Sequence, residues 1–383
     1  MEMSSQDNRM RNWRRALHQV PEFGFDTKKT AAFVIEKLKS FGIDNITDGV
    51  GGTGVVATLK RGTSRKAIAI RADMDALMIE EKTNLEYRST IPGIMHACGH
   101  DGHTATLLGV AETLAKGDYF DGIIHFIFQP AEEWGKGAQA MIDDGLIQRF
   151  PFEEIWGFHN MPGIPIGSFE TRSGPMMSAE DNFEIELIGV GGHASKPQAG
   201  KETMLPACSI ITELQTIVSR RIDPTDIAVL SVTELITDGS RNILPGLSRI
   251  LGDARSFRTD VSKTIEKEMR AIASGIATAH GLECKITYTR EFIPLINDDK
   301  LAEHAIKIGQ KVFGSKRAKL ADQPVTGSED FARFLDYAPG CYVFFGNGEN
   351  SAPLHNSSYD FNDDALQQGL KFLVNLASSR LPT

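Results

Sequence analysis

Short apolar runs rich in β-branched residues alternate with amphipathic helical patterns in the N-terminal part of the chain, and this alternation constrains the fold more than any other feature. The apolar runs lie at 54–58, 67–70, 123–128 and 155–158, and the helical patterns lie at 27–41, 103–116 and 136–149. Continuously apolar strands are typical of parallel sheets that are buried on both faces, and the intervening helices provide the cover. The sequence therefore predicts an α/β domain with a mainly parallel sheet covered by helices.

In the middle of the chain, strands in which apolar and polar residues alternate replace the continuously apolar ones. We expect such strands at 183–188, 228–236, 247–257 and 284–289, with helices at 203–221 and 261–280. Alternation with period two indicates a sheet with one face open to solvent. After this segment the helix–strand alternation resumes. We therefore expect a discontinuous α/β domain at 1–180 and 293–383, interrupted by an inserted α+β domain at 181–292.

Composition excludes several classes of protein. The 383 residues include 41 Lys and Arg against 50 Asp and Glu, and the net charge of −9 argues against nucleic acid or an anionic membrane as a partner. No apolar stretch approaches the ~18 residues that cross a bilayer. The four cysteines are too scattered for a disulfide framework, and the polar N-terminus lacks the apolar core of a signal peptide. We expect a cytoplasmic protein.

Acidic and imidazole side chains follow the predicted strands, at the sheet edge where open α/β proteins bind ligands. They are Asp73 and Asp75 after the run at 67–70, Glu132 and Glu133 after 123–128, His159 after 155–158, and His355 after an apolar run at 342–345. A loop before the helix at 103–116 adds Cys98 and His100. Because the carboxyl ends of parallel strands share one edge, we expect these side chains to converge, as a metal site requires.

Cys98 and His100 are separated by a single glycine. Thiolate and imidazole bind zinc and other borderline metals, and carboxylates also suit manganese. A lone pair of this kind is more often an inert buried cysteine beside a helix-capping histidine. Here the other acids and histidines favour a metal site.

Glu132 and Glu133 follow Pro130, so their side chains are expected to point in different directions. One carboxylate can then bind a metal while the other faces water as a general base. The alternative is a solvated acidic turn. Asp73 and Asp75 are either helix caps or carboxylates that hold a ligand histidine.

The remaining histidines are less informative. His159 is either a ligand or a satisfied core histidine, and His193 is far in sequence from the other candidates and is either a functional residue or only part of a turn. The pattern places His125 in the core, leaves His96 and His103 ambiguous, and predicts surface positions for His18, His280 and His304.

Taken together, these residues resemble the M20 metallopeptidase and aminoacylase family, specifically its amidohydrolase branch. That branch includes hippurate hydrolases, N-acetylamino-acid deacetylases and plant indole-acetyl-amino-acid hydrolases. The matching blocks follow the family order and lie at 18–24, 71–77, 95–103, 128–133, 191–194, 242–245, 327–331 and 354–362. The resemblance therefore covers nearly the whole chain.

The resemblance implies two divalent metal ions per subunit, zinc or manganese with nickel or cobalt as alternatives. It assigns the metal ligands to Cys98, His100, Glu133, His159 and His355. It implies that Glu132 is the general base and that Asp75 orients a ligand. Asp73 stands where other branches of the family place a ligand histidine.

The resemblance also makes the inserted domain a lid and dimerisation domain. His193 is similar to the histidine that one subunit's lid lends to its partner's active site. Asn242 and Arg255 match lid positions expected near the substrate carboxylate or the oxyanion. We expect a homodimer in which the strand at 183–188 offers an open sheet edge and the helix at 203–221 an apolar face.

The implied reaction is metal-dependent hydrolysis of the amide bond of N-acyl-L-amino acids, such as N-acetyl or N-benzoyl (hippurate-like) substrates. A metallo-dipeptidase or carboxypeptidase of the same family is the nearest alternative. A hydrolase that uses Cys98 as nucleophile, with His100 or His96 as its base, is a second one. A non-catalytic metal-binding protein is a third, which the presence of Glu132 beside Glu133 disfavours.

Overall fold

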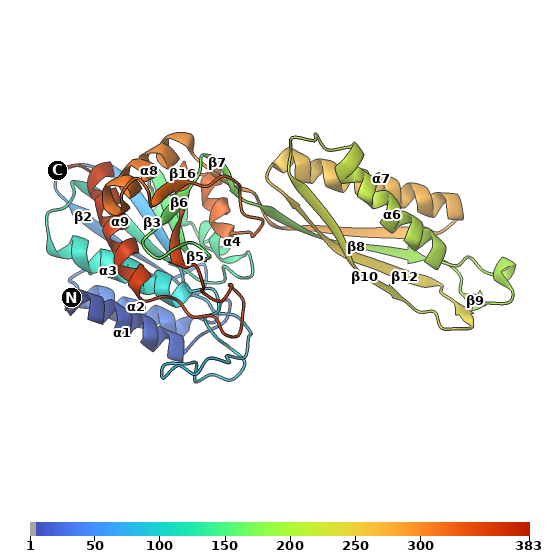
Figure 1. The fold of residues 1–383 in the computed structure, drawn as a ribbon, viewed down its shortest axis with the longest axis horizontal. Helices are drawn as coiled ribbons and strands as arrows, with labels where there is room; N and C mark the ends of the chain where they lie inside the picture. Colours follow the sequence, from blue (N-terminus) through green and yellow to red (C-terminus); the bar gives the residue numbers. More distant parts are fainter. Residues whose placement is uncertain (1–4) are drawn as a thin grey trace. The chain divides into compact units, whose positions relative to one another are not determined.

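The computed structural model describes residues 5–383, which fold into two compact units. The larger unit runs to Met176 and continues through Ile296–Pro324 and Asp330–Thr383. The smaller unit comprises Met177–Leu295 and Val325–Glu329. In Figure 1 the smaller unit carries the green to light orange part of the colour scale, and the larger unit carries both ends of it. The smaller unit is therefore an insertion into the larger one.

A mixed eight-stranded sheet with the order β1-β2-β4-β3-β5-β16-β6-β15 forms the centre of the larger unit. Its strands are β1 (Ile46–Val50), β2 (Gly54–Arg61), β3 (Ala67–Asp73), β4 (Gly122–Gln129), β5 (Glu154–Pro162), β6 (Phe169–Thr171), β15 (Ala318–Leu320) and β16 (Gly340–Gly348). The central strands β4, β3, β5 and β16 run parallel, whereas β1, β2 and β6 each pair antiparallel with a neighbour. The predicted parallel sheet is thus confirmed at the centre.

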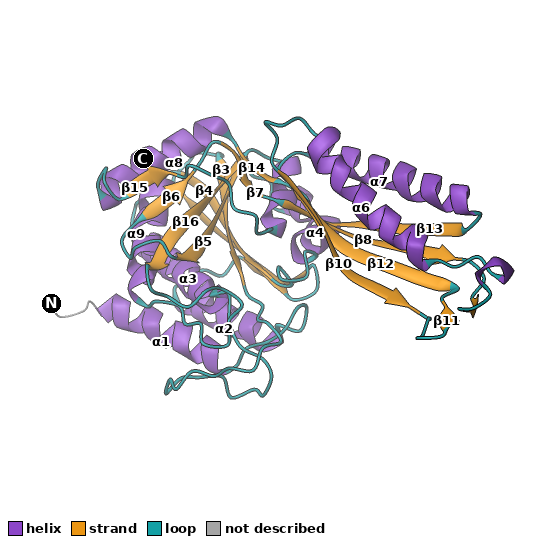
Figure 2. Ribbon diagram, turned by 45° about the vertical axis from the view of Figure 1, so that its right-hand side comes forward, coloured by secondary structure: helices purple, strands orange, loops and turns teal. Residues whose placement is uncertain are grey.

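Helices cover this sheet (Figure 2). They are α1 (Ser5–Gln19), α2 (Lys28–Ser40), α3 (His100–Lys116), α4 (Gly137–Asp143), α5 (Leu146–Arg149), α8 (Asp299–Phe313), α9 (Asp364–Arg380) and the 3₁₀ helix η2 (Asp330–Asp336). In α2, Ala31, Val34 and Leu38 recur on one face and are buried, as the helical spacing predicts. The sequence pattern gave no bounds for α1, although it placed His18 in a helical stretch.

The smaller unit holds an antiparallel sheet with the order β10-β12-β8-β13. Its strands are β8 (Ala179–Ile188), β10 (Ala228–Thr237), β12 (Leu247–Ser256) and β13 (Glu283–Phe292), and its helices are α6 (Met204–Arg220) and α7 (Thr259–His280). Alternate residues of β8, namely Phe183, Ile185 and Leu187, are buried in a core that includes Ile210 and Leu214 of α6. The predicted α+β insertion with a half-covered sheet is confirmed.

Short elements complete the chain. They are β7 (Gly174–Met177), which pairs with β14 (Leu295–Asn297), β9 (Gly192–His193), which pairs with β11 (Ile243–Leu244), and the 3₁₀ helix η1 (Pro197–Ala199). No helix within residues 5–383 is both long and apolar enough to cross a bilayer.

The sheet order corrects one expectation about self-association. The strand at 183–188 was expected to offer an open edge, but β8 lies between β12 and β13 and has no free edge. The apolar face of α6 is also occupied, because Ile210, Leu214 and Ile217 pack against the sheet. The edge strands are β10 and β13, and β10 exposes Val229, Leu235 and Ile236.

Candidate active site

The ends of the central parallel strands deliver most of the predicted site residues to one place. Asp73 ends β3, His159 lies in the last part of β5, and the two glutamates follow β4. His355 follows β16, and its Nε2 lies 3.3 Å from Oε2 of Glu133. Segments far apart in the sequence therefore meet because parallel strands end at the same sheet edge.

Cys98, His100 and His159 form a buried group of metal-binding atoms. Sγ of Cys98 lies 3.3 Å from Nε2 of His159, and one ligand atom from each of the three residues lies within 4.8 Å of the others. Glu133 and the exposed His355 form a second group of metal-binding atoms with the same cysteine. Cys98 is therefore shared by two potential metal sites.

The donor atoms of this group fit a cation. Nε2 of His100 and Oε1 of Glu133 are buried and have no hydrogen-bond partner among the described residues. A buried polar atom without a partner costs about 1–3 kcal/mol. Metal coordination offsets that cost, and a mixed sulfur, nitrogen and oxygen set suits divalent transition metals.

The charges of the site also favour a bound cation. Burial disfavours the imidazolium form of His100, but the surrounding Asp73, Asp75 and Glu133 carboxylates outweigh it and raise the pKa of His100 to about 10. Burial and the Glu133 and Glu132 carboxylates raise the pKa of the Cys98 thiol well above its usual range. The side chains thus form a concentrated negative field, which a bound cation neutralises.

Asp75 holds the turn that carries the two glutamates. Its Oδ1 accepts the backbone N–H of Glu132 at 3.0 Å, and its Oδ2 accepts that of Glu133 at 3.2 Å. Its Oδ1 also lies 3.5 Å from Nδ1 of His100. Ala131, which directly precedes Glu132, has a φ of 52°, in the left-handed region that residues other than glycine seldom adopt. Asp75 is therefore bound to this strained turn and is not a helix cap.

A second carboxylate, Asp73, belongs to a buried chain of hydrogen bonds. Its Oδ1 lies 2.7 Å from Nδ1 of His103, and its Oδ2 accepts from Arg71 Nη1 at 2.7 Å. Nε2 of His103 lies 2.7 Å from Oδ1 of Asn160 and 3.1 Å from the backbone nitrogen of the same residue. Both nitrogens of His103 are thereby used, which resolves its ambiguity in favour of a structural role.

Asn160 also orients His159. Nδ1 of His159 donates to the backbone oxygen of Asn160, which leaves Nε2 of His159 directed toward Cys98. Metal-binding histidines commonly use their second nitrogen in this way. Asn160 was not predicted, although its place directly after His159 at the end of β5 was a signal.

The sequence analysis also did not identify Arg71 and Asp330 as functional candidates. Arg71 is fully buried, and it donates to Asp330 at 3.1 Å and to Gln129 at 2.8 Å. The backbone N–H of Asp330 lies 3.4 Å from Oε1 of Glu132. Both residues lie in the sequence blocks that resemble the family, but only the fold brings them close to Glu132.

Another histidine expectation was wrong. His18 was expected at the surface, but it is fully buried, and its Nδ1 lies 2.8 Å from Oδ2 of Asp101. Arg14 binds the same carboxylate at 2.9 Å. The helical spacing placed His18 correctly on α1. It did not predict that α1 packs on α3, which is what buries His18. His96 is also buried, and neither of its ring nitrogens has a hydrogen-bond partner among the described residues.

Two of the predicted lid residues lie together in the smaller unit. β9 and β11 pair so that His193 is opposite Ile243, and the backbone N–H of Ala194 donates to the backbone oxygen of Asn242 at 3.0 Å. His193 and Asn242 are both exposed. Both therefore belong to the pair of segments that β9 and β11 join.

Arg255 lies elsewhere in the smaller unit. It is near the end of β12 opposite Glu180, eight residues beyond Leu247, or roughly 26 Å along the strand. Its guanidinium is paired with Glu180 and with Asp253, each at 2.9 Å, and also donates to Ser328. The structure thus separates Arg255 from His193 and Asn242 within this unit.

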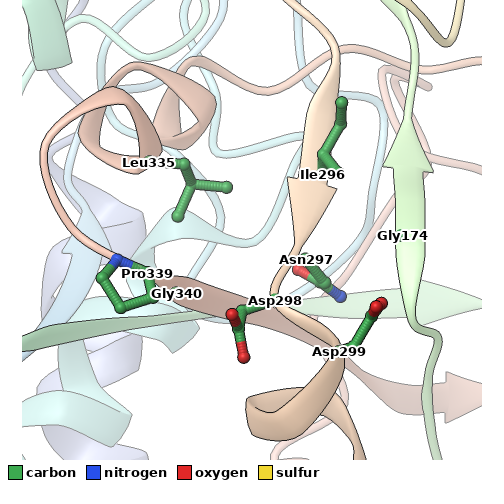
Figure 3. Close-up of a pocket in the computed structure, with 8 residues that line it drawn as sticks. All are labelled: Gly174, Ile296, Asn297, Asp298, Asp299, Leu335, Pro339 and Gly340. Carbon is green, nitrogen blue, oxygen red and sulfur yellow. The ribbon is translucent and has the colours of Figure 1, made fainter.

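A polar pocket of about 480 Å³ lies elsewhere in the larger unit, at the start of α8 (Figure 3). Its polar groups are already used. Asp298 caps α8 by accepting the backbone N–H of Leu301, and Asn297 Oδ1 accepts that of Tyr342 at 2.7 Å. Asp299 accepts from Ser173. These groups stabilise the start of α8, and we assign the pocket no function.

Known proteins share this fold and sequence pattern. The family model described as peptidase family M20/M25/M40 matches residues 69–379. Hippurate hydrolase of Campylobacter jejuni is 41% identical, with 95% of this chain and 94% of that protein covered. N-acetyl-L-cysteine deacetylase of Bacillus subtilis is 36% identical, with 99% and 90% covered. The YXEP protein of Bacillus subtilis, described as a dinuclear metal binding peptidase from the M20 family, superimposes with a TM-score of 0.86 at 31% identity and covers 99% of both chains.

The fold and the site define a metal-binding hydrolase of amide bonds. The chain belongs to peptidase family M20/M25/M40, in its amidohydrolase branch. The family resemblance found in the sequence is thereby confirmed.

Proposed function

We propose that this protein hydrolyses the amide bond of N-acyl-L-amino acids and releases a carboxylic acid and a free amino acid. The buried cluster around Cys98, with its unpartnered His100 and Glu133 atoms, is the observation that carries the proposal. The names of the relatives support the substrate class, because one acts on hippurate and another on N-acetyl-L-cysteine.

The residues that hold the metals in this proposal are those with converging ligand atoms. Cys98 belongs to both groups of converging atoms, and together with His100, Glu133, His159 and His355 it would hold the metals. Zinc or manganese is the proposed metal, with nickel or cobalt as alternatives, because the donor set mixes sulfur, nitrogen and oxygen. Bound divalent cations lower the pKa of water and polarise a carbonyl group.

Glu132 is the proposed general base. It is buried, its backbone is held by Asp75, and its Oε2 lies 4.0 Å from Nε2 of His100, among the potential metal ligands. Its carboxylate accepts the proton of the attacking water and later returns that proton to the nitrogen of the departing amine. A positioned general base typically contributes about 10²–10⁴-fold to the rate.

His193 is the proposed oxyanion donor, supplied by the lid of one subunit to the site of its partner. The backbone N–H of Ser195 donates to Nδ1 of His193 at 3.1 Å, so the neutral ring carries its proton on Nε2. That N–H is a hydrogen-bond donor for the oxygen on which negative charge develops. The backbone oxygen of Asn242 accepts from Ala194, the residue after His193, and Asn242 stays a candidate for binding substrate. Arg255 is the weaker candidate, because it is already paired with two carboxylates.

The fold also supports a proposal about the domains and one about assembly. We assign 1–180 and 293–383 to the catalytic domain and 181–292 to the lid. The lids pair through the exposed edge of β10 and form a homodimer, because an unpaired strand with exposed Val229, Leu235 and Ile236 is prone to pair with a second copy. A cytoplasmic location stays a prediction from the scattered cysteines.

A thiol mechanism is the alternative from another class. Cys98 has a histidine within reach, namely His159 at 3.3 Å, rather than His96 or His100 as the sequence suggested. A nucleophilic cysteine needs a lowered pKa, whereas burial and the neighbouring glutamates raise that of Cys98. Chelator distinguishes the two, because a thiol enzyme keeps its activity when metal is removed.

The test of the proposed function is hydrolysis of a panel of substrates by protein reconstituted with each metal. The panel contains N-acetyl amino acids, N-benzoyl amino acids and dipeptides. We expect N-acyl amino acids to be cleaved, and cleavage to stop with chelator and return with metal. Preferential cleavage of dipeptides would instead assign the protein to the dipeptidase or carboxypeptidase alternative.

A further inference from the structure

One buried hydroxyl group, that of Tyr359, lies among the segments that carry the proposed metal ligands. Tyr359 follows β16 and comes shortly after His355 in the chain, and its side chain is fully buried. The backbone N–H of Tyr359 donates to Asn356 at 2.9 Å, and that of His355 donates to Ala97 at 2.8 Å. The loop that bears both residues is thus bound to the backbone beside Cys98.

The Tyr359 hydroxyl is bonded to the side chain of Asn160. Nδ2 of Asn160 donates to the hydroxyl, and both residues are buried. Oδ1 of the same amide lies 2.7 Å from Nε2 of His103, so both ends of the amide are held. The backbone oxygen of Asn160 accepts from Nδ1 of His159. A single residue therefore separates the hydroxyl from a proposed ligand.

The same two side chains contact the glycine between Cys98 and His100. Gly99 has a φ of 93°, in the left-handed region that favours glycine. A Cβ atom at this position would lie 2.6 Å from the Tyr359 hydroxyl and closer still to Oδ1 of Asn160. Only a residue without a side chain permits this approach. The two polar groups thus pack directly against the backbone from which Cys98 and His100 project.

The Tyr359 hydroxyl keeps its proton in this environment. Burial, together with the charges of Asp101 and Cys98, raises the pKa of Tyr359 well above its usual range. The phenolate, which is the form that binds metals, is thereby disfavoured. The hydroxyl therefore acts through its hydrogen bond and its packing, and not as a metal ligand.

We propose that Tyr359 is a positioning residue whose hydroxyl sets the arrangement of the metal ligands through Asn160 and Gly99. The inference rests on the proposed function, because it adopts the ligands assigned there. Every proposed ligand except Glu133 lies on a segment that meets at this hydroxyl. Buried hydrogen-bond networks rigidify the groups that they join, and residues that support metal ligands commonly tune metal affinity.

The experiment measures metal binding in Tyr359→Phe, which removes the hydroxyl and keeps the ring that fills the core. Co²⁺ is titrated into metal-free protein and followed by thiolate-to-cobalt charge-transfer absorption, which reports the bond between Cys98 and the metal. We expect the Kd for Co²⁺ to rise about 10–100-fold, the loss typical of a residue that supports a ligand. We also expect the spectrum of the saturated variant to differ from that of wild type, because the ligands are arranged differently.

Tyr288→Phe is the matched control. The hydroxyl of Tyr288 also makes a hydrogen bond, to Asp181 at 2.7 Å, but Tyr288 belongs to the smaller unit, whereas all the proposed ligands belong to the larger one. We expect the Kd and the spectrum of wild type. The free energy of unfolding of metal-free protein is measured for both variants. If Tyr359→Phe lowers this stability but leaves the Kd and the spectrum unchanged, Tyr359 only stabilises the core and the proposal is wrong.

A double-mutant cycle tests the route through Asn160. Asn160→Ala removes the side-chain amide and keeps the backbone oxygen that His159 uses, and it should raise the Kd at least as much as Tyr359→Phe. If the hydroxyl acts through this amide, Tyr359→Phe adds little to Asn160→Ala, whereas independent sites give additive effects. Additive effects, or a wild-type Kd in Asn160→Ala, would overturn the proposal. Should Tyr359→Phe not fold, the Kd of Asn160→Ala decides, because the proposed route runs through this amide.

These measurements need no turnover, which separates the inference from the proposed function. If wild-type protein binds Co²⁺ but does not hydrolyse N-acyl amino acids, the proposed function fails, and the change in Kd still decides the role of Tyr359. If wild-type protein shows no thiolate-to-cobalt absorption, Cys98 is not a ligand, and the inference about Tyr359 fails with that assignment.

Discussion

Asp75 accepts the backbone N–H of Glu132 at 3.0 Å, so the carboxylate that follows β3 fixes the turn that follows β4. The second oxygen of Asp75 holds Glu133 in the same way. Neighbouring glutamates are thereby presented to one site from a backbone that a buried acid anchors. Their roles in the proposed mechanism differ, and each role has its own test.

The first prediction concerns Asp75 itself. Asp75→Asn keeps the size of the side chain but weakens the hold on His100 and on the glutamate turn. We expect activity to fall about 10–100-fold with a smaller loss of bound metal, as is typical when a partner of a ligand histidine is changed. Metal analysis and turnover are measured on the same sample. Unchanged activity would remove Asp75 from the site.

The second prediction separates the two glutamates. Glu132→Gln keeps shape and hydrogen bonding but loses basicity, so metal should stay near wild-type occupancy while turnover falls at least ~10²–10⁴-fold. Glu133→Gln should bind less metal and lose activity as a consequence. Metal content and turnover are measured in parallel for both variants. The reverse pattern would exchange their roles, and an active Glu132→Gln protein with metal bound would exclude Glu132 as the base.

The third prediction concerns the ligands. Cys98→Ser and His159→Ala each remove a donor atom from the group around Cys98. We expect both variants to hold less metal than wild type, by elemental analysis after dialysis against metal-free buffer. His125→Ala is the control, because His125 bonds to Thr58 and lies outside this group. Full metal occupancy in Cys98→Ser would place Cys98 outside the site.

The fourth prediction is a pH dependence of stability that arises from His18. Burial disfavours its charged form, but Asp101 and a hydrogen bond from the His18 ring to the Glu81 carboxylate outweigh this and raise the pKa of His18 to about 9, from 6.5. A raised pKa in the folded state contributes stability that is fully present below pH 6.5 and is lost as pH rises through 9. The contribution is at most about 3 kcal/mol. We expect the difference in free energy of unfolding between wild type and His18→Gln to shrink across this range. A difference that is constant with pH would show that His18 is neutral in the fold.

The fifth prediction concerns assembly. A homodimer through β10 should appear as twice the chain mass of 42.0 kDa in light scattering at micromolar concentration. Ile236→Lys places a charge on the exposed edge of β10 and should favour the monomer. The same change at Leu320, an exposed residue of the larger unit, is the control. A monomeric wild-type protein would leave His193 without a partner site.

Much of the fold could be predicted because it follows from local patterns of apolar and polar residues. Apolar runs and helical spacing located β3, β4 and β5 and helices such as α2 and α3, and the change to alternating residues located the inserted unit. Strand ends then indicated Glu133, His159 and His355, because a parallel sheet collects its carboxyl ends at one edge. Periodicity depends on a few neighbouring residues, so the sequence alone carries it.

The tertiary structure decided whatever depends on partners that are remote along the chain. The order of strands placed β8 inside its sheet rather than at an edge, and the packing of α1 buried His18 against Asp101. Arg255 forms ion pairs with two carboxylates, those of Glu180 and Asp253. Arg241, in the turn between Ser240 and Ile243, forms no ion pair within residues 5–383. Which charges pair and which side chains are buried depends on long-range packing, and no local pattern encodes it.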